Sequence, residues 1–198
     1  MRSHTLSLAS MSLAAALLLA GCSTGTDGGM AGMDHRTAST SPTPSASFDA
    51  NSADQLFVQM MIRHHQQAIE MADMILDKDG VDSRVSDLAE QIKDAQGPEI
   101  DTMQGWLGDW GVDSGHAHSM GDDGMMSQDD MTALKNATGT DAARLFLEGM
   151  IGHHEGAISM AMTELAGGQN SDVTGLAQQV IDGQSAEITT MNEILGSL

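Results

Sequence analysis

The chain has 198 residues, a length that supports one folded domain with or without a tail. Its 28 Asp and Glu against 8 Lys and Arg give a formal net charge of −20, which excludes nucleic acid as a partner and favours metal ions, because each phosphate contact needs a cation. One Cys beside 17 Met excludes a disulfide framework and thiolate zinc or iron–sulfur sites, which need several cysteines.

Residues 1–21 have the layout of a secretory signal peptide, with Arg2 followed by an acid-free apolar run over 11–20. The run is too short to cross a membrane as a helix. It ends in Leu-Ala-Gly-Cys22, which resembles the lipobox of bacterial lipoproteins, where the Cys takes a diacylglyceryl group. We therefore expect a lipoprotein anchored to a membrane through Cys22 and located outside the cytoplasm, at the cell surface or in the periplasm.

Residues 22–50 are expected to form the lipidated Cys and a flexible tether, because Ser, Thr, Gly, Ala and Pro dominate the segment and cannot build a core. The tether nevertheless carries Met30, Met33 and His35. Packing does not explain these side chains, so they are candidate metal ligands.

The remainder, 51–198, is one unit used twice. The segment that begins at Phe57 aligns with the segment that begins at Phe146, at an offset of 89 residues, and a second pair of segments aligns at an offset of 88. Each unit predicts two amphipathic helices joined by a short turn, so the fold class is an all-α four-helix bundle built from two repeated antiparallel hairpins. The predicted helices span 53–77, 82–110, 141–166 and 171–196. The first repeat covers 53–111, a Met/His-rich linker covers 112–128, and the second repeat covers 129–198.

Both first helices carry adjacent histidines. His64 lies in the middle of the apolar stripe, with Met61 one turn before it, and His153 repeats this position. His65 and His154 fall at the edge of the stripe, where we expect them to serve a surface site or to cap a neighbouring helix.

Both second helices carry a carboxylate on an apolar face. Glu99 lies among residues that include Met103, and Glu187 lies among residues that include Met191. One interpretation is structural: each Glu accepts a hydrogen bond from the core His of its hairpin, and Met fills space. The other is a metal site, because imidazole and thioether ligands suit copper and a carboxylate can ligate or orient the imidazole.

The linker contains a second candidate site. It has no apolar periodicity and is rich in Gly, so it is predicted to be a loop, and loops do not normally collect methionine. Because Cu(I) favours thioether and imidazole ligands, the cluster indicates copper over zinc, calcium or magnesium. Its candidate ligands are His116, His118, Met120, Met125 and Met126.

The paired motif Met-Ile-x-His-His-x-x-Ala-Ile-x-Met-Ala, with Glu-Ile-x-x-Met in both second helices, resembles the domain of unknown function 305 family over about 54–198. The resemblance implies a ferritin-like four-helix bundle and a secreted or periplasmic copper binder linked to copper tolerance. One departure from the repeat is Gly149, which stands where the first unit has Met60 and predicts a second copy poorer in ligands. The positions carried over by the resemblance are His64, His65, Met61, Met71, His153, His154, Met150 and Met160.

The expected function is copper sequestration, buffering or delivery to an unidentified transfer partner, with copper rather than zinc or iron as the metal, and no enzymatic activity. Three alternatives remain open: a ferritin-like di-metal oxidase, haem b held by His and Met, and a non-metal lipid-anchored helical interaction module. The oxidase is disfavoured because no histidine of the domain has Glu three residues before it. Covalent c-type haem is excluded by the missing Cys-x-x-Cys-His.

Overall fold

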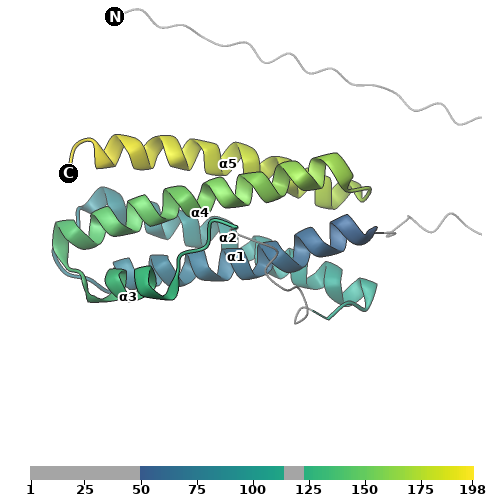
Figure 1. The fold of residues 1–198 in the computed structure, drawn as a ribbon, viewed down its shortest axis with the longest axis horizontal. Coiled ribbons are helices and arrows are strands. Elements are labelled where there is room, and N and C mark those ends of the chain that lie inside the picture. The colour runs from purple at the N-terminus through teal and green to yellow at the C-terminus, as the bar shows by residue number, and fades with distance from the viewer. Residues whose placement is uncertain (1–49, 114–122) are drawn as a thin grey trace, which may run out of the picture. The chain divides into compact units, whose positions relative to one another are not determined.

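The structure is a computed structural model that describes residues 50–113 and 123–198. These residues form four long helices that run side by side along a common axis, and one short helix (Figure 1). The all-α prediction is confirmed. The long helices are α1 (Ser52–Leu76), α2 (Ser83–Trp110), α4 (Gly139–Gly167) and α5 (Ser171–Leu195), and the short one is α3 (Gln128–Asn136).

Side-chain caps explain where three of the four long helices begin. Asn51 and Asp54 form a capping box at the start of α1, and Asp82 and Asn170 cap α2 and α5. Pro98 lies inside α2, which continues through it to Trp110. The predicted helix ends therefore agree with the observed ones to within about two residues, the usual scatter of helix boundaries.

Helix α3 was missed by the sequence analysis, which assigned residue 128 to the linker and began the next helix at 141. Ser127 caps α3, and its Met131 and Leu134 are buried against α1 and α4. Nine residues are too few to show a convincing apolar period, so this helix depends on tertiary packing.

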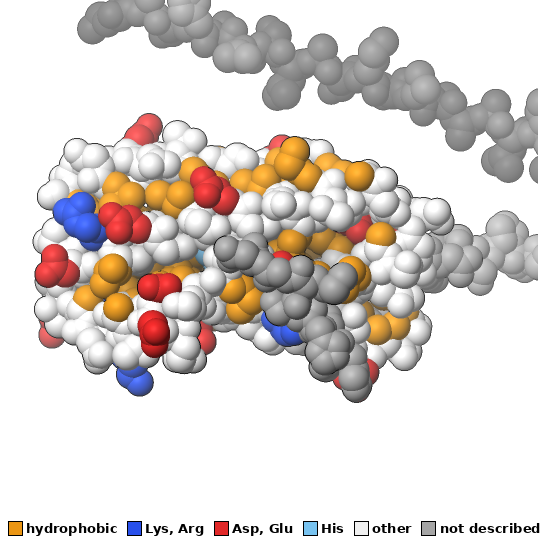
Figure 2. Space-filling view, viewed as in Figure 1, with side chains coloured by type: hydrophobic (Ala, Val, Ile, Leu, Met, Phe, Trp, Pro, Cys, Tyr) orange, Lys and Arg blue, Asp and Glu red, His pale blue; other side chains and the backbone are white. Residues whose placement is uncertain are grey.

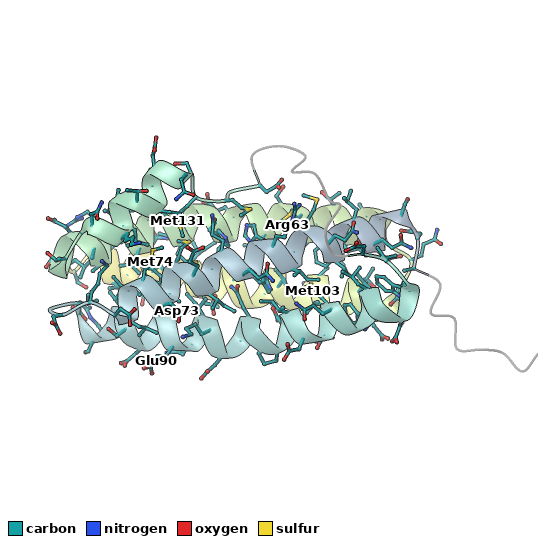
Figure 3. All side chains as sticks on the ribbon, turned by 90° about the horizontal axis from the view of Figure 1, so that it is seen from below. Arg63, Asp73, Met74, Glu90, Met103 and Met131 are labelled. Atoms are coloured by element: carbon teal, nitrogen blue, oxygen red, sulfur yellow. The ribbon has the colours of Figure 1, made fainter. Side chains whose placement is uncertain are left out.

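Two apolar clusters fill the bundle, one on each side of its middle. The first joins the C-terminal half of α1, the start of α2, α3, the start of α4 and the end of α5. The second joins the opposite halves of the same long helices. Helix α1 therefore runs antiparallel to α2, its partner in the first hairpin, and also to α4 of the second hairpin. In Figure 3, Met74 and Met131 lie toward one end of the bundle and Met103 toward the other.

Acidic side chains are spread over the face of the bundle in Figure 2, with strips of apolar side chains between them. Such a surface concentrates cations near the protein. Among the helices described here, none is long and apolar enough to cross a membrane.

The end of the linker lies against α1 and α4. Gly124 has a positive φ of 75°, and a Cβ there would lie 2.9 Å from Gly156 Cα of α4. Gln67 of α1 holds the same segment through two hydrogen bonds, donating to the Met126 carbonyl oxygen at 3.0 Å and accepting from the Met126 N–H at 2.8 Å. The linker thus reaches the middle of the bundle by close backbone contact on one side and hydrogen bonds on the other.

We expect Gly156→Ala to destabilise the bundle by about 1–3 kcal/mol, the usual cost of overpacking, because its Cβ would overlap the Asp123 carbonyl group. Gly152→Ala is the matched control on the same helix, since a Cβ at Gly152 meets nothing within 4 Å. Urea unfolding measures both variants. Equal stabilities would contradict close packing of the linker on α4.

Candidate metal centre

His64 of α1 and His153 of α4 meet ring to ring in the middle of the bundle. Their ring centroids are 3.6 Å apart and the ring planes are inclined by 35°. The two residues are 1% and 0% exposed, and they belong to neither apolar cluster. The central position predicted for both histidines is therefore correct.

His65 and His154 are also fully buried, and each bonds a carboxylate of its own hairpin. His65 Nε2 donates to Glu99 Oε2 at 2.7 Å, and His154 Nε2 donates to Glu187 Oε2 at 2.6 Å. Each Glu side chain keeps about a quarter of its surface exposed. The carboxylates thus accept hydrogen bonds while remaining partly hydrated, which lowers the cost of placing charge there.

This arrangement corrects two predictions. His65 and His154 do not lie at a surface or cap a helix, because α2 and α5 cover the edge of the stripe. Their imidazoles, rather than those of His64 and His153, bond the carboxylates. A single helix step of about 100° turns each second histidine toward the partner helix of its hairpin.

Burial sets the protonation state of the central pair. It is the main cause that lowers the pKa of His64 to about 3, with the nearby histidines adding to the effect. Burial likewise lowers the pKa of His153 well below its ordinary value, assisted by repulsion from His64. Both rings are therefore neutral at neutral pH, the state in which imidazole binds a metal.

The linker fixes which nitrogen of His64 is protonated. His64 Nε2 lies 3.0 Å from the carbonyl oxygen of Asp123, and a carbonyl oxygen only accepts. The proton is therefore on Nε2, and Nδ1 keeps its lone pair.

Several imidazole nitrogens in this centre have no hydrogen-bond partner among the described residues. They are Nδ1 of His64, His65 and His154, and both nitrogens of His153. Buried polar atoms are normally paired, so a group of unpaired ones requires an explanation such as an ion or water. In the described ranges, no three or more His, Cys, Asp or Glu side chains are placed so that together they could hold a metal ion. The centre is thus a set of available donors whose coordination would require side-chain rotation.

The predicted methionine ligands are divided between the two apolar clusters. Met61 and Met103 pack in one cluster, and Met71, Met150 and Met191 pack in the other, all five fully buried. Met160 is partly buried beside the cluster that contains Met61 and Met103. The structure therefore does not bring these thioethers together, and packing accounts for most of them.

Met126 reaches the bundle from the linker. A Cβ on Gly149 would lie 2.7 Å from Met126 Sδ, so the absence of a side chain at Gly149 makes room for this sulfur. Met125 stays 39% exposed. The other predicted ligands and the lipidation site lie outside the described residues; they are His116, His118, Met120, Met30, Met33, His35 and Cys22.

Sequence reasoning missed two polar features near the centre. Gln96 and Gln184 are buried one turn before Glu99 and Glu187, and the shared Gln-x-x-Glu spacing in the repeat was the available signal. At one end of the bundle, burial and then the carboxylate of Asp54 raise the pKa of Glu164 to about 8. Nothing in the amphipathic pattern signalled that pair.

The comparisons assign a family. The family model "Domain of unknown function (DUF305)" matches residues 54–195, so the chain belongs to the DUF305 family. None of the curated proteins matches the chain.

Solved structures resemble this one over most of their length. A DUF305 fragment from Deinococcus radiodurans is 34% identical with a TM-score of 0.69, covering 75% of this chain and 99% of its own. A predicted secreted DUF305 protein from Streptomyces coelicolor is 31% identical with a TM-score of 0.70, covering 73% and 91%. CopM in its Cu(I)-bound form is 33% identical with a TM-score of 0.61, covering 73% and 96%. CopM structures also include Cu(II)-bound, silver-bound and apo forms.

The neutral pair predicts acid sensitivity of the metal-free chain. Between pH 6.5 and about 3 the unfolded chain binds a proton at His64 that the folded chain does not, so the free energy of unfolding falls as pH falls. The slope is about 1.4 kcal/mol per pH unit for each such histidine, and this contribution is complete above pH 6.5.

Urea unfolding in the presence of a chelator measures this slope. The double variant His64→Leu/His153→Leu should show a smaller slope between pH 6 and 4. Carboxyl groups change the stability of the parent chain and of the double variant equally as pH falls. Glu164 is one of them, and its raised pKa adds stability as pH falls below about 8. If the free energy of unfolding fell equally with pH in the parent and the double variant, the His64–His153 pair would not be buried in its neutral form.

Proposed function

We propose that this chain binds copper outside the cytoplasm, where it sequesters, buffers or delivers Cu(I) or Cu(II). The proposal includes anchoring to a membrane through lipid on Cys22, as the N-terminal sequence predicts. The secreted character predicted for the Streptomyces coelicolor relative supports the location. The strongly acidic composition supports a cation as the partner.

The His64–His153 pair carries this proposal. Two neutral imidazoles lie 3.6 Å apart at their centroids, both retain unpaired nitrogens, and neither must lose a proton to bind a metal. Nitrogen ligands in low-dielectric surroundings suit copper in either oxidation state. His65 and His154 are adjacent donors, each oriented by a carboxylate as metal-binding histidines commonly are.

The CopM structures support the choice of metal. That protein binds Cu(I), Cu(II) and silver, and it shares the fold and about a third of its residues with this chain. Silver and Cu(I) are both soft monovalent ions that prefer nitrogen and thioether sulfur. The same preference fits the histidines here and the methionines of the linker.

A division of roles follows between linker and bundle. Met125 is exposed, and Met126 places its sulfur against α4 at Gly149. We propose that the linker methionines and the tether ligands capture copper from solution, and that the central histidines hold it. Exposed thioethers are accessible to an incoming ion, whereas the buried imidazoles require the side chains to rotate first.

We further propose that the chain acts by binding rather than by catalysis. Di-metal oxidases of four-helix bundles use Glu-x-x-His on two helices, and Met61 and Met150 occupy the Glu positions before the central histidines. An iron-dependent absorption band in the purified chain would instead favour the oxidase.

Cu(I) titration against a competing chelator tests the central pair. The full chain with Cys22→Ser is the reference, because a free thiol would also bind Cu(I). His64→Leu/His153→Leu should lose one bound Cu(I) or weaken it at least tenfold, about 1.4 kcal/mol. Met103→Leu/Met191→Leu is the control, since both methionines pack in apolar clusters. Unchanged Cu(I) affinity in the histidine variant would reject the central site.

Replacing Met120, Met125 and Met126 by Leu tests the linker. We expect fewer Cu(I) ions per chain and slower loading, with the affinity of the remaining bundle site unchanged, because Leu keeps the volume and removes the thioether. Stopped-flow mixing with a chelated Cu(I) donor measures the loading rate. Normal stoichiometry and normal loading would assign capture to another segment.

A further inference from the structure

Helices α2 and α5 face each other across a seam with hollows along it. The middle hollow has a volume of about 50 Å³ and lies between equivalent positions of the two repeats. Its polar walls come from Gln96 and Glu99 of α2 and from Gln179, Gln184 and Glu187 of α5. We call this hollow the Gln–Glu chamber. The rest of the lining is Ala95 of α2 with Val180 and Gly183 of α5.

The two glutamines of the chamber are buried and incompletely paired. Gln96 is 3% exposed and Gln184 is 5% exposed. Within the described chain, neither amide atom of Gln96 has a hydrogen-bond partner, and Oε1 of Gln184 has none. A buried amide atom without a partner is unfavourable, and unpaired amide oxygens at both repeat-related positions point to a bound species between them.

The two carboxylates add charge to the same space. One oxygen of each already accepts from a histidine, Oε2 of Glu99 from His65 and Oε2 of Glu187 from His154. Among the described residues, no hydrogen bond occupies the second oxygen of either carboxylate, and no Lys or Arg lines this hollow. A cation is therefore the species that would balance the chamber.

We propose that the Gln–Glu chamber binds one hard divalent cation of the Ca²⁺, Mg²⁺ or Mn²⁺ class. Two carboxylates and two amides that line one hollow would supply an oxygen-only donor set, which such ions prefer. The volume of about 50 Å³ admits an ion with a water, since water occupies about 30 Å³ in the liquid. His65 and His154 orient the carboxylates from behind, as outer partners of metal-binding carboxylates commonly do.

This site differs in donor chemistry from the proposed copper site, and the His65–Glu99 and His154–Glu187 hydrogen bonds join the two. Copper prefers the nitrogen and sulfur donors on the α1/α4 side, whereas the chamber offers oxygen on the α2/α5 side. The cation would join one helix of each hairpin and so tie the two repeats together. Its expected role is to stabilise the bundle in proportion to cation concentration. The proposal does not rest on copper binding.

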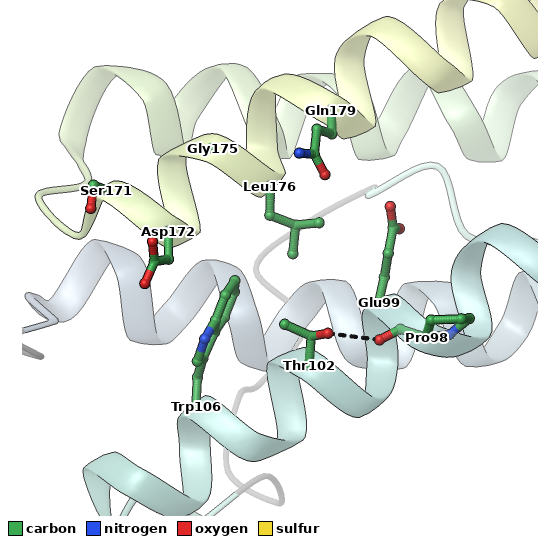
Figure 4. A pocket seen from close by; sticks show the side chains of 9 residues that line it. All are labelled: Pro98, Glu99, Thr102, Trp106, Ser171, Asp172, Gly175, Leu176 and Gln179. Carbon is green, nitrogen blue, oxygen red and sulfur yellow. Dashed lines mark hydrogen bonds between the residues drawn. The ribbon is translucent and has the colours of Figure 1, made fainter. Parts of the chain in front are cut away.

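Terbium luminescence provides a local probe, because Tb³⁺ occupies oxygen sites as Ca²⁺ does and emits when a nearby Trp is excited. Trp106 and Glu99 line the same neighbouring hollow and point from α2 toward α5 (Figure 4). The full chain should show saturable, Trp-sensitised Tb³⁺ emission that excess Ca²⁺ or Mn²⁺ displaces. The same ions should raise the melting temperature of the full chain.

Gln96→Leu/Gln184→Leu is the decisive variant. It removes the unpaired amides and leaves both His–Glu pairs in place, so the metal-free variant should be at least as stable as the parent. We expect Tb³⁺ affinity to fall at least tenfold and the cation-dependent melting shift to vanish. Gln91→Leu/Gln178→Leu is the matched control, because both glutamines are exposed on the same two helices.

Two outcomes would overturn the proposal: no saturable Trp-sensitised emission in the parent chain, or emission and melting shift retained in the Gln96→Leu/Gln184→Leu variant. Cu(I) titration of that variant keeps the two proposals apart. Unchanged Cu(I) binding together with lost Tb³⁺ binding supports the chamber as a separate site. If the variant lost both Cu(I) binding and Tb³⁺ binding, the chamber and the histidines would form one site and the proposal of a separate site would be wrong.

Discussion

The contact between His64 and His153 constrains the rest of the bundle. Two imidazoles whose centroids are 3.6 Å apart repel each other if both carry a proton, so the fold must keep them neutral. Apolar clusters on both sides of the pair exclude water and favour the neutral form. Burial also removes hydrogen-bond partners, so the arrangement that lowers the pKa leaves nitrogens without a partner among the described residues.

The linker breaks the symmetry of the two repeats at this pair. The three α4 positions that contact or border the linker are Gly149, Gly152 and Gly156, and their counterparts in α1 are Met60, Arg63 and Gln67. The glycines of α4 let the linker backbone approach that helix, and Gln67 of α1 hydrogen-bonds the linker from the opposite side. The sequence predicts from Gly149 a second repeat poorer in ligands. In the structure, the space at Gly149 is occupied by the Met126 sulfur from the linker.

The sequence was sufficient to predict the long helices, their pairing and the central position of His64, because each depends on a periodic apolar pattern that repeats. It was insufficient for His65 and for α3. An apolar stripe is drawn from hydrophobic residues alone, so a buried polar residue with its own partner, such as His65 with Glu99, is assigned to the edge. Helix α3 is short and is stabilised by contacts with α1 and α4 that no local pattern encodes. The predicted ligand methionines do not converge because they lie at different heights along the bundle. Met61 precedes His64 and Met71 follows it on α1, so their thioethers pack on opposite sides of the His pair.

Charge balance explains why histidines and carboxylates share the middle of this bundle. A copper ion at the neutral pair would bring positive charge into surroundings that resist it, and apolar side chains cannot offset that cost. Glu99 and Glu187 bond the adjacent imidazoles and remain partly hydrated, so they would supply compensating negative charge at the edge of the centre. Had each carboxylate been fully buried, it would itself have required a cation at all times. Partial exposure allows the centre to be stable both without and with a metal, which is the property that reversible binding requires.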